Sequence, residues 1–123
     1  MTNQDGLLPK AHRFEDLWIW QQSRTLVQHV YSDFGNDDLG FRWQIQGAAM
    51  SVMNNIAEGF EKSSDPDFTR FLDIAKGSCG EVRSMYYVAE DLKYVPEEIA
   101  TTRREMGGRI SADISSLQNH LRT

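Results

Sequence analysis

The residue types that carry most protein chemistry are few in this sequence, and their spacing matches no catalytic or metal-binding motif. The histidines are His12, His29 and His120, and none has a glutamate three residues before it. A di-iron site in a helical bundle needs glutamates together with such Glu-x-x-His pairs. Zinc-type Cys/His spacing, a Gly-x-Ser-x-Gly turn and a phosphate-binding glycine loop do not occur either. We therefore expect no catalytic residue, no metal site and no cofactor.

One thiol and a few carboxylates remain as candidates for chemistry. Cys79 lies on an apolar helical stripe, so we expect a buried and unreactive thiol. Glu58 and Glu81 lie close to apolar stripes, and Asn55 is near Glu58. These acids could form a catalytic pair, or they could make hydrogen bonds and ion pairs at helix contacts. The basic partners expected in the second case are Lys62, Arg70 and Arg83.

Length and composition indicate a single intracellular domain. The chain has 123 residues, which is enough for one core, and its one cysteine cannot form an internal disulfide. No apolar run approaches the roughly 18 residues of a membrane span. Residues 1–10 lack the apolar segment of a signal peptide. We expect a cytoplasmic protein without a membrane partner.

The charge of the chain argues against a nucleic-acid partner. The net charge is −5, and an acidic protein repels phosphate backbones at long range. The basic residues are scattered, and the only adjacent pair is Arg103–Arg104. The candidate phosphate contacts are Arg42, Lys62, Arg70, Lys76, Arg103 and Arg104.

The elements that would position these side chains are all helices. Prolines occur only at positions 9, 66 and 96, and apolar residues recur at three- and four-residue spacing between them. We expect helices at about 14–34, 39–62, 66–93 and 96–122. Short loops between long helices favour antiparallel neighbours. Residues 13–123 should therefore form an up-down-up-down four-helix bundle behind a flexible leader at 1–12.

The expected helix ends carry recognisable signals. The run 35–38 should end the first helix, and its acids can cap the second. Asp65 is the expected N-cap of the third helix, Pro66 its first helical residue, and Pro96 begins the fourth. The glycine pair at 107–108 costs the fourth helix roughly 1 kcal/mol per residue relative to alanine. A weak or bent point, or the close approach of another backbone, is expected there.

One apolar run exceeds what a single bundle core can bury. Residues 17–20 read Leu-Trp-Ile-Trp, and at about 100° per residue they cover most of a helix circumference. Exposed aromatic patches mark subunit interfaces, so we expect homo-oligomerisation. Cover by a loop or by the leader is the alternative. The interface candidates are Leu17, Trp18, Trp20, Phe41 and Trp43.

Small residues are concentrated on the two central helices. They are Gly59, Gly77, Ser78 and Gly80. Glycine destabilises a helix, so its repeated use indicates tight helix packing. A ligand pocket is the alternative interpretation.

Two long stretches of the sequence resemble a known family. Residues 51–60 read Ser-Val-Met-Asn-Asn-Ile-Ala-Glu-Gly-Phe, and residues 71–81 read Phe-Leu-Asp-Ile-Ala-Lys-Gly-Ser-Cys-Gly-Glu. With Phe-Glu-Asp-Leu at 14–17 and Ala-Glu-Asp-Leu-Lys-Tyr at 89–94, they make the chain similar to the four-helix-bundle proteins encoded in intervening sequences of 23S rRNA genes. The motif residues, which we interpret as structural, are Asn55, Glu58, Gly59, Gly77, Ser78 and Glu81.

The resemblance implies a homopentamer. A related branch resembles the accessory proteins of diversity-generating retroelements, which are basic pentamers that bind reverse transcriptase and nucleic acid. The arginines common in the family before the first motif are replaced here by Gln-Ile-Gln-Gly-Ala-Ala at 44–49, which weakens the case for RNA binding.

We therefore expect a non-enzymatic, homo-oligomeric scaffold or adaptor with a protein or RNA–protein partner. The alternative is a nucleic-acid-binding accessory factor associated with rRNA or a reverse transcriptase. An enzyme remains a third hypothesis, and it would need a deep polar pocket that holds Asn55, Glu58 and Glu81 together.

Overall fold

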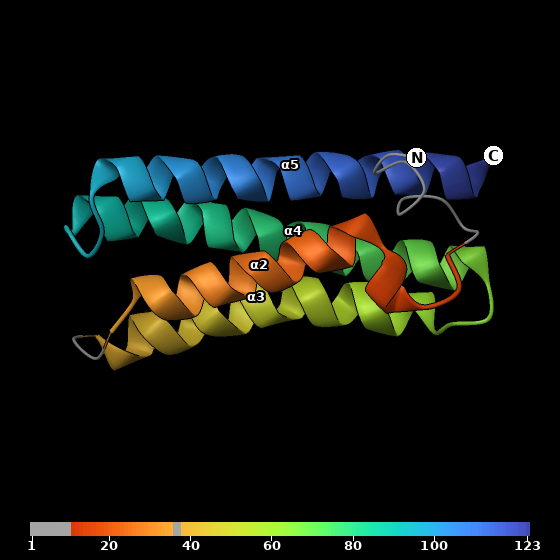
Figure 1. Cartoon of the computed structure of the whole chain (residues 1–123), viewed down its shortest axis with the longest axis horizontal. Helices are drawn as coiled ribbons and strands as arrows, with labels where there is room; N and C mark the ends of the chain where they lie inside the picture. The colour runs from red at the N-terminus through yellow and green to blue at the C-terminus, as the bar shows by residue number, and fades with distance from the viewer. Residues whose placement is uncertain (1–10, 36–37) are drawn as a thin grey trace.

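Four helices packed in chain order make up the protein. The computed structural model describes residues 11–35 and 38–123. A short 3-10 turn, η1 (Phe14–Asp16), precedes the helices α2 (Trp18–Asp33), α3 (Leu39–Phe60), α4 (Asp65–Asp91) and α5 (Glu97–Arg122). Each helix packs on the next, and α2 also contacts α5. This all-α arrangement is that of an up-down bundle, as the sequence predicts (Figure 1). The predicted leader falls mainly on residues 1–10, which lie outside the described residues.

The bundle consists of two helix pairs. Figure 1 shows α2 beside α3 in one pair and α4 beside α5 in the other. The C-terminal end of α2 and the start of α3 lie at the same end of the bundle as the α4–α5 loop, and the α3–α4 loop lies at the other. Neighbouring helices therefore run antiparallel, which short loops require.

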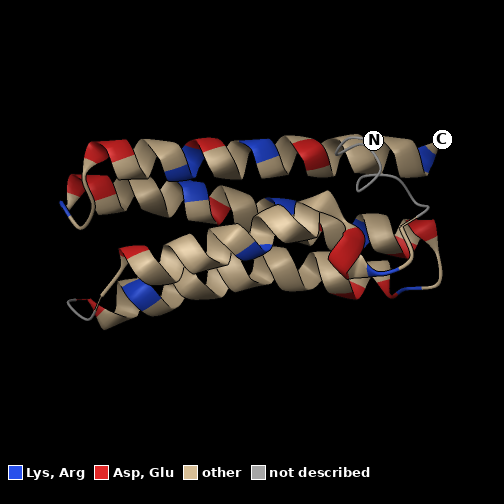
Figure 2. Ribbon diagram, in the orientation of Figure 1, with Lys and Arg blue, Asp and Glu red and all other residues tan. Residues whose placement is uncertain are grey.

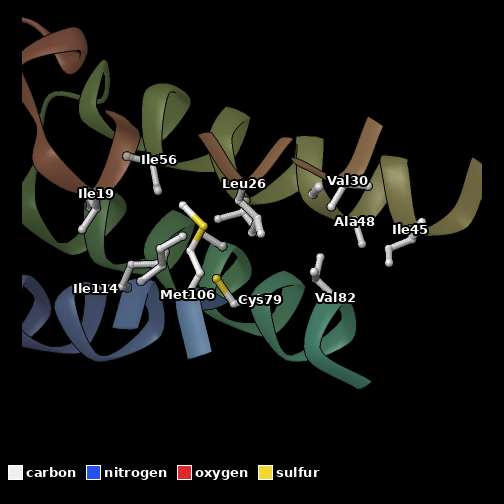
Figure 3. Close-up of a cluster of buried hydrophobic side chains, with 14 of the residues drawn as sticks. Ile19, Leu26, Val30, Ile45, Ala48, Ile56, Cys79, Val82, Met106 and Ile114 are labelled. Atoms are coloured by element: carbon white, nitrogen blue, oxygen red, sulfur yellow. The ribbon is translucent and has the colours of Figure 1, made fainter. Parts of the chain in front are cut away.

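The core is formed by the apolar stripes that the periodicity predicts. Side chains from all four helices meet between the two pairs (Figure 3). Those from α4 include Leu72, Ala75, Cys79 and Val82, all fully buried. Stripes at three- and four-residue spacing keep one helix face in the core along its whole length.

Side-chain caps begin two of the helices. Asp38 is the N-cap of α3, and its carboxylate accepts a hydrogen bond from the Phe41 amide at 3.1 Å. The N-cap of α4 is Ser64, so the prediction of Asp65 was wrong by one residue. Ser64 has extended backbone angles, and its hydroxyl accepts a hydrogen bond from the Asp67 amide, while Asp65 is already helical. A short hydroxyl side chain is as suitable a cap as a carboxylate.

More of the apolar run at 17–20 is buried than would be possible if all four residues belonged to one continuous helix. Leu17 lies before the start of α2 with extended backbone angles, so it does not follow the helical rotation of its neighbours. Leu17 and Ile19 are buried, whereas Trp18 and Trp20 are half-buried. The Phe14 ring of η1 packs edge-on against Trp20 with the ring centroids 5.2 Å apart. Cover by a neighbouring segment is the alternative to a subunit interface for this run. The η1 turn provides part of that cover.

Two glycines mark close contacts between helices. A Cβ on Gly59 would lie 2.8 Å from the Phe71 Cβ, so α3 and α4 approach closely there. At Gly107 it would lie 2.9 Å from the Arg83 Cγ. Helix α5 nevertheless continues through 107–108 as a regular helix. The close approach expected at this pair thus occurs at Gly107, where the Arg83 side chain lies against α5.

A candidate self-association surface

The metal-ligating and nucleophilic side chains of the described residues are dispersed over the bundle. Among them, no group of three or more His, Cys, Asp or Glu side chains is placed to hold a metal ion. Burial raises the pKa of the Cys79 thiol to about 12, which leaves it protonated and unreactive. None of the best-formed pockets in the described part of the chain is lined by Asn55, Glu58 or Glu81.

The motif residues of α3 and α4 form a hydrogen-bonded seam between these helices. The Ser51 and Ser78 hydroxyls lie 2.8 Å apart across the seam. The Asn55 amide donates to the Ser51 carbonyl oxygen at 2.8 Å. Further along, the Gln44 amide donates to the Glu81 carboxylate at 3.2 Å. The Ser51–Ser78 and Gln44–Glu81 hydrogen bonds join the two helices, whereas the Asn55–Ser51 bond lies within α3. The structural role of the motif residues stays a prediction. The partner of Glu81 is Gln44 on α3, where the sequence suggested a basic residue.

A network that sequence reasoning missed lies at the opposite end from the α3–α4 loop. The Asp33 carboxylate accepts hydrogen bonds from Arg103 at 2.7 and 3.0 Å and from the Tyr86 hydroxyl at 2.7 Å. Only 8% of the Asp33 side chain and 13% of the Arg103 side chain are exposed. Hydrogen bonding to Asp33 raises the pKa of Arg103, while burial raises that of Tyr86. The network ties α2, α4 and α5 together.

Most of the candidate phosphate contacts are used inside the chain. Arg103 is paired with Asp33, and Arg104 lies 2.9 Å from the Glu90 carboxylate and 3.9 Å above the Tyr87 ring. Lys76 donates to Gln118, a buried polar residue on α5. Arg42 donates to the Gly35 carbonyl oxygen. The exposed candidates are Lys62 and Arg70, whose cations both lie over the Phe71 ring. As nucleic-acid contacts, all six remain predictions.

Of the predicted interface residues, Trp43 protrudes most. It is 65% exposed on α3. Phe41 is half-buried and packs against the Phe34 and Tyr94 rings, with centroids 5.2 and 5.3 Å apart. Leu17 is buried inside the subunit, so it is unsuited to a contact between subunits. Among the predicted interface residues, the exposed aromatic area is therefore centred on α3, and the tryptophans of α2 contribute only partly.

The α2–α3 pair carries very few charged side chains. Lys, Arg, Asp and Glu occur twice on α2 and twice on α3, against nine times on α4 and eight times on α5. Figure 2 shows the same contrast between the ribbons of the two pairs. Of the four, Asp33 is held by Arg103, and Arg42 donates to Gly35. We call α2 and α3 together the neutral layer. Depletion of charge is a property of interface cores.

A second feature is the outward surface of the α3–α4 hairpin, which we call the hairpin outer face. Residues at three- and four-residue spacing share one side of a helix. On α3 this side carries Trp43, Gly47 and Asn54, and on α4 it carries Ile74, Gly77, Glu81 and Val88. All seven are exposed. The Gln44–Glu81 hydrogen bond joins the two stripes across the seam.

No contact within the chain explains why positions 47 and 77 of the hairpin outer face are glycines. A Cβ at Gly47 or Gly77 would meet nothing within 4 Å, and neither residue has a positive φ. Each nevertheless costs its helix roughly 1 kcal/mol relative to alanine. The contrast with Gly59, where a Cβ would collide with Phe71, shows that the fold itself needs glycine at only some of these positions.

Several hollows of about 120 to 530 Å³ lie on the described surface. One of about 120 Å³ lies at the end of the bundle and is lined mainly by Phe34, Phe41, Arg42, Lys93 and Tyr94. Another of about 240 Å³ lies between α2 and α5 beside Trp18 and Asp113. Burial raises the pKa of Asp113. Neither hollow brings together the motif residues of α3 and α4.

Comparison with known proteins agrees with the motifs. Among the described residues, no helix has both the length and the apolar character needed to cross a membrane. No curated protein matches the chain. The family profile described as 23S rRNA-intervening sequence protein matches residues 15–116, which includes the hydrogen-bonded seam and most of the bundle. Since the match covers most of its length, the chain belongs to the 23S rRNA-intervening sequence protein family.

Proposed function

We propose that this protein is a non-enzymatic, homo-oligomeric scaffold or adaptor that assembles as a pentamer through its neutral layer. The observation that carries the proposal is the scarcity of charge on α2 and α3, with Trp43 exposed on α3. Solvent-facing helices normally carry charged and polar residues on their outer side. A second copy that covers this layer would bury Trp43 without burying unpaired charge. The single, buried thiol of Cys79 suits the reducing cytoplasm.

The charged pair of helices supports the adaptor part of the proposal. If the neutral layer is covered by other copies, α4 and α5 still present most of the charged side chains to solvent. Charged rims and surfaces set orientation and partner choice more than affinity. A protein or RNA–protein complex bound by the assembly would therefore contact α4 and α5.

The proposal is tested by measuring mass in solution. Size-exclusion chromatography with light scattering should report about five times the 14.1 kDa of one chain. Trp43→Ser should lower the mass, because it removes the largest exposed aromatic side chain of the neutral layer. Tyr87→Ser is the matched control, since Tyr87 is 58% exposed but its ring lies against Arg104 of α5, away from the neutral layer. A wild-type chain that stays monomeric at micromolar concentrations would refute the proposal.

A nucleic-acid-binding accessory factor is the second candidate, favoured by the exposed cations of Lys62 and Arg70 beside Phe71. Phosphate contacts release counterions, so such binding weakens steeply with salt. Fluorescence titration with structured RNA at low and high salt checks this. Lys62→Gln and Arg70→Gln together should weaken binding if these residues contact phosphate. Absence of binding at low salt would exclude the candidate.

A further inference from the structure

The glycines Gly47 and Gly77 leave the hairpin outer face open to close approach from outside the subunit. Both lie well inside long helices, both are exposed, and a Cβ at either position would meet only open space. Glycine destabilises a helix interior, and its usual compensation is the close approach of another backbone. Within the subunit that compensation is absent at these two positions, although it is present at Gly59.

The surroundings of the two glycines are suited to a protein surface. Trp43, Ile74 and Val88 are exposed apolar side chains on the same face. The polar groups of the seam between them are already hydrogen-bonded, since Ser51 pairs with Ser78 and Gln44 with Glu81. Covering this face would therefore remove apolar area from water without stranding these donors and acceptors.

We propose that a helix of a second copy of this chain packs across the α3–α4 seam and makes its closest approach at Gly47 and Gly77. The inference rests on the proposed self-association and identifies the surface where the backbones come closest. The depressions left by the missing side chains would receive side chains of the second copy. Large exposed side chains such as Trp43 are of the kind that fills such a depression.

Charge and size favour a second copy over a nucleic acid. The charged residue of the hairpin outer face is Glu81, whose exposed carboxylate would repel phosphates. Two neighbouring helices of this length present a surface on the order of 35 Å by 20 Å, about 700 Å². That is comparable with the roughly 800 Å² that each partner contributes to a standard-size interface.

Leucine substitutions separate folding from association. Gly77→Leu and Gly47→Leu introduce a good helix former into open space, so each subunit should remain folded and helical. In the assembly, the same side chain would hold the second backbone away. We expect the mass to fall to that of one chain at a concentration where the wild type is assembled. Gly108→Leu is the matched control, because its Cβ also meets nothing within 4 Å but it lies on α5.

Cysteine labelling tests the same contact without disturbing it. Cys79 is buried and its pKa is raised to about 12, so an introduced thiol is labelled alone. In the assembled protein, Gly47→Cys and Gly77→Cys should react with a maleimide far more slowly than Gly108→Cys. Equal labelling rates in an intact oligomer, or leucine variants that keep the wild-type mass, would overturn this inference while leaving self-association standing. A monomeric wild type would remove both proposals.

Discussion

At the scale of single residues, the Asp33 carboxylate is a strongly constrained polar group of the bundle. It is almost buried, and it accepts hydrogen bonds from an arginine on α5 and a tyrosine on α4. His29, one turn before Asp33 on α2, has its pKa lowered by burial and then by the Arg103 cation. A neutral imidazole at position 29 therefore accompanies the Asp33–Arg103 pair near neutral pH.

The Asp33→Asn variant should lose about 3 kcal/mol of unfolding free energy, because it leaves the Arg103 cation poorly solvated and without its counter-charge. Urea denaturation followed by circular dichroism measures this. Asp67→Asn is the control, since Asp67 and Arg70 are 3.6 Å apart with more than half of each side chain exposed. Removing such a surface pair should cost no more than about 1 kcal/mol. Equal losses in the two variants would show that Asp33 is not specially stabilising.

At the scale of the elements, helix ends and helix crossings follow different physical rules. The end of α4 is closed by hydrogen bonds from the amides of Lys93 and Tyr94 to the carbonyl oxygens of Glu90 and Ala89. This closure puts Lys93 in the left-handed region, with φ of 63°. Helix crossings depend instead on side-chain size, as at Gly59 and Phe71.

Lys93→Gly should stabilise the protein by up to about 1 kcal/mol, because a residue without Cβ adopts the left-handed conformation at a helix end with little strain. Thermal unfolding of the two proteins under identical conditions checks it. Lys93→Ala tests the cause, since alanine also carries a Cβ and should give no such gain. A similar gain from alanine would point to the loss of the lysine side chain and away from the backbone.

Gly59→Ala and Gly108→Ala should change stability in opposite directions. The new methyl group at Gly59 collides with the Phe71 Cβ and the Phe68 ring and should cost about 1–3 kcal/mol. At Gly108 it meets open space, so the gain in helix propensity should stabilise α5 by up to about 1 kcal/mol. Chemical denaturation of both variants measures the difference. The same sign in both would contradict the helix contact described at Gly59.

At the scale of the whole molecule, charge divides the bundle into two halves. Helices α4 and α5 carry most of the charged residues, and the neutral layer carries few (Figure 2). An isolated subunit would expose a neutral surface together with Trp43, which is unusual for a chain with a net charge of −5. The proposed self-association through that surface would resolve the imbalance.

Self-association should depend little on ionic strength, because charge pairs contribute little to contact through the neutral layer. The mass in solution should remain constant between about 0.05 and 0.5 M sodium chloride, although the Debye length falls severalfold. Light scattering across this range is the measurement. Dissociation at high salt would show that charge pairs hold the copies together, which would contradict contact through the neutral layer.

The sequence by itself determined the number of helices, their approximate bounds, their core stripes and the family. These properties depend on the 3.6-residue periodicity, on proline and asparagine or aspartate signals, and on two motifs, all of which are local in the chain. Even there, the N-cap of α4 was misplaced by one residue, because Ser64 and Asp65 are both competent caps.

Only the tertiary structure decided which polar and small residues meet. Asp33 and Arg103 are 70 positions apart, and Gln118 is buried because Asp73, Lys76 and the Thr69 carbonyl face it from α4. Likewise, Gly59 and Gly77 are indistinguishable in sequence, yet one faces Phe71 and the other faces open space. Such outcomes depend on the rotation and register of packed helices, which each helix's own periodicity leaves free.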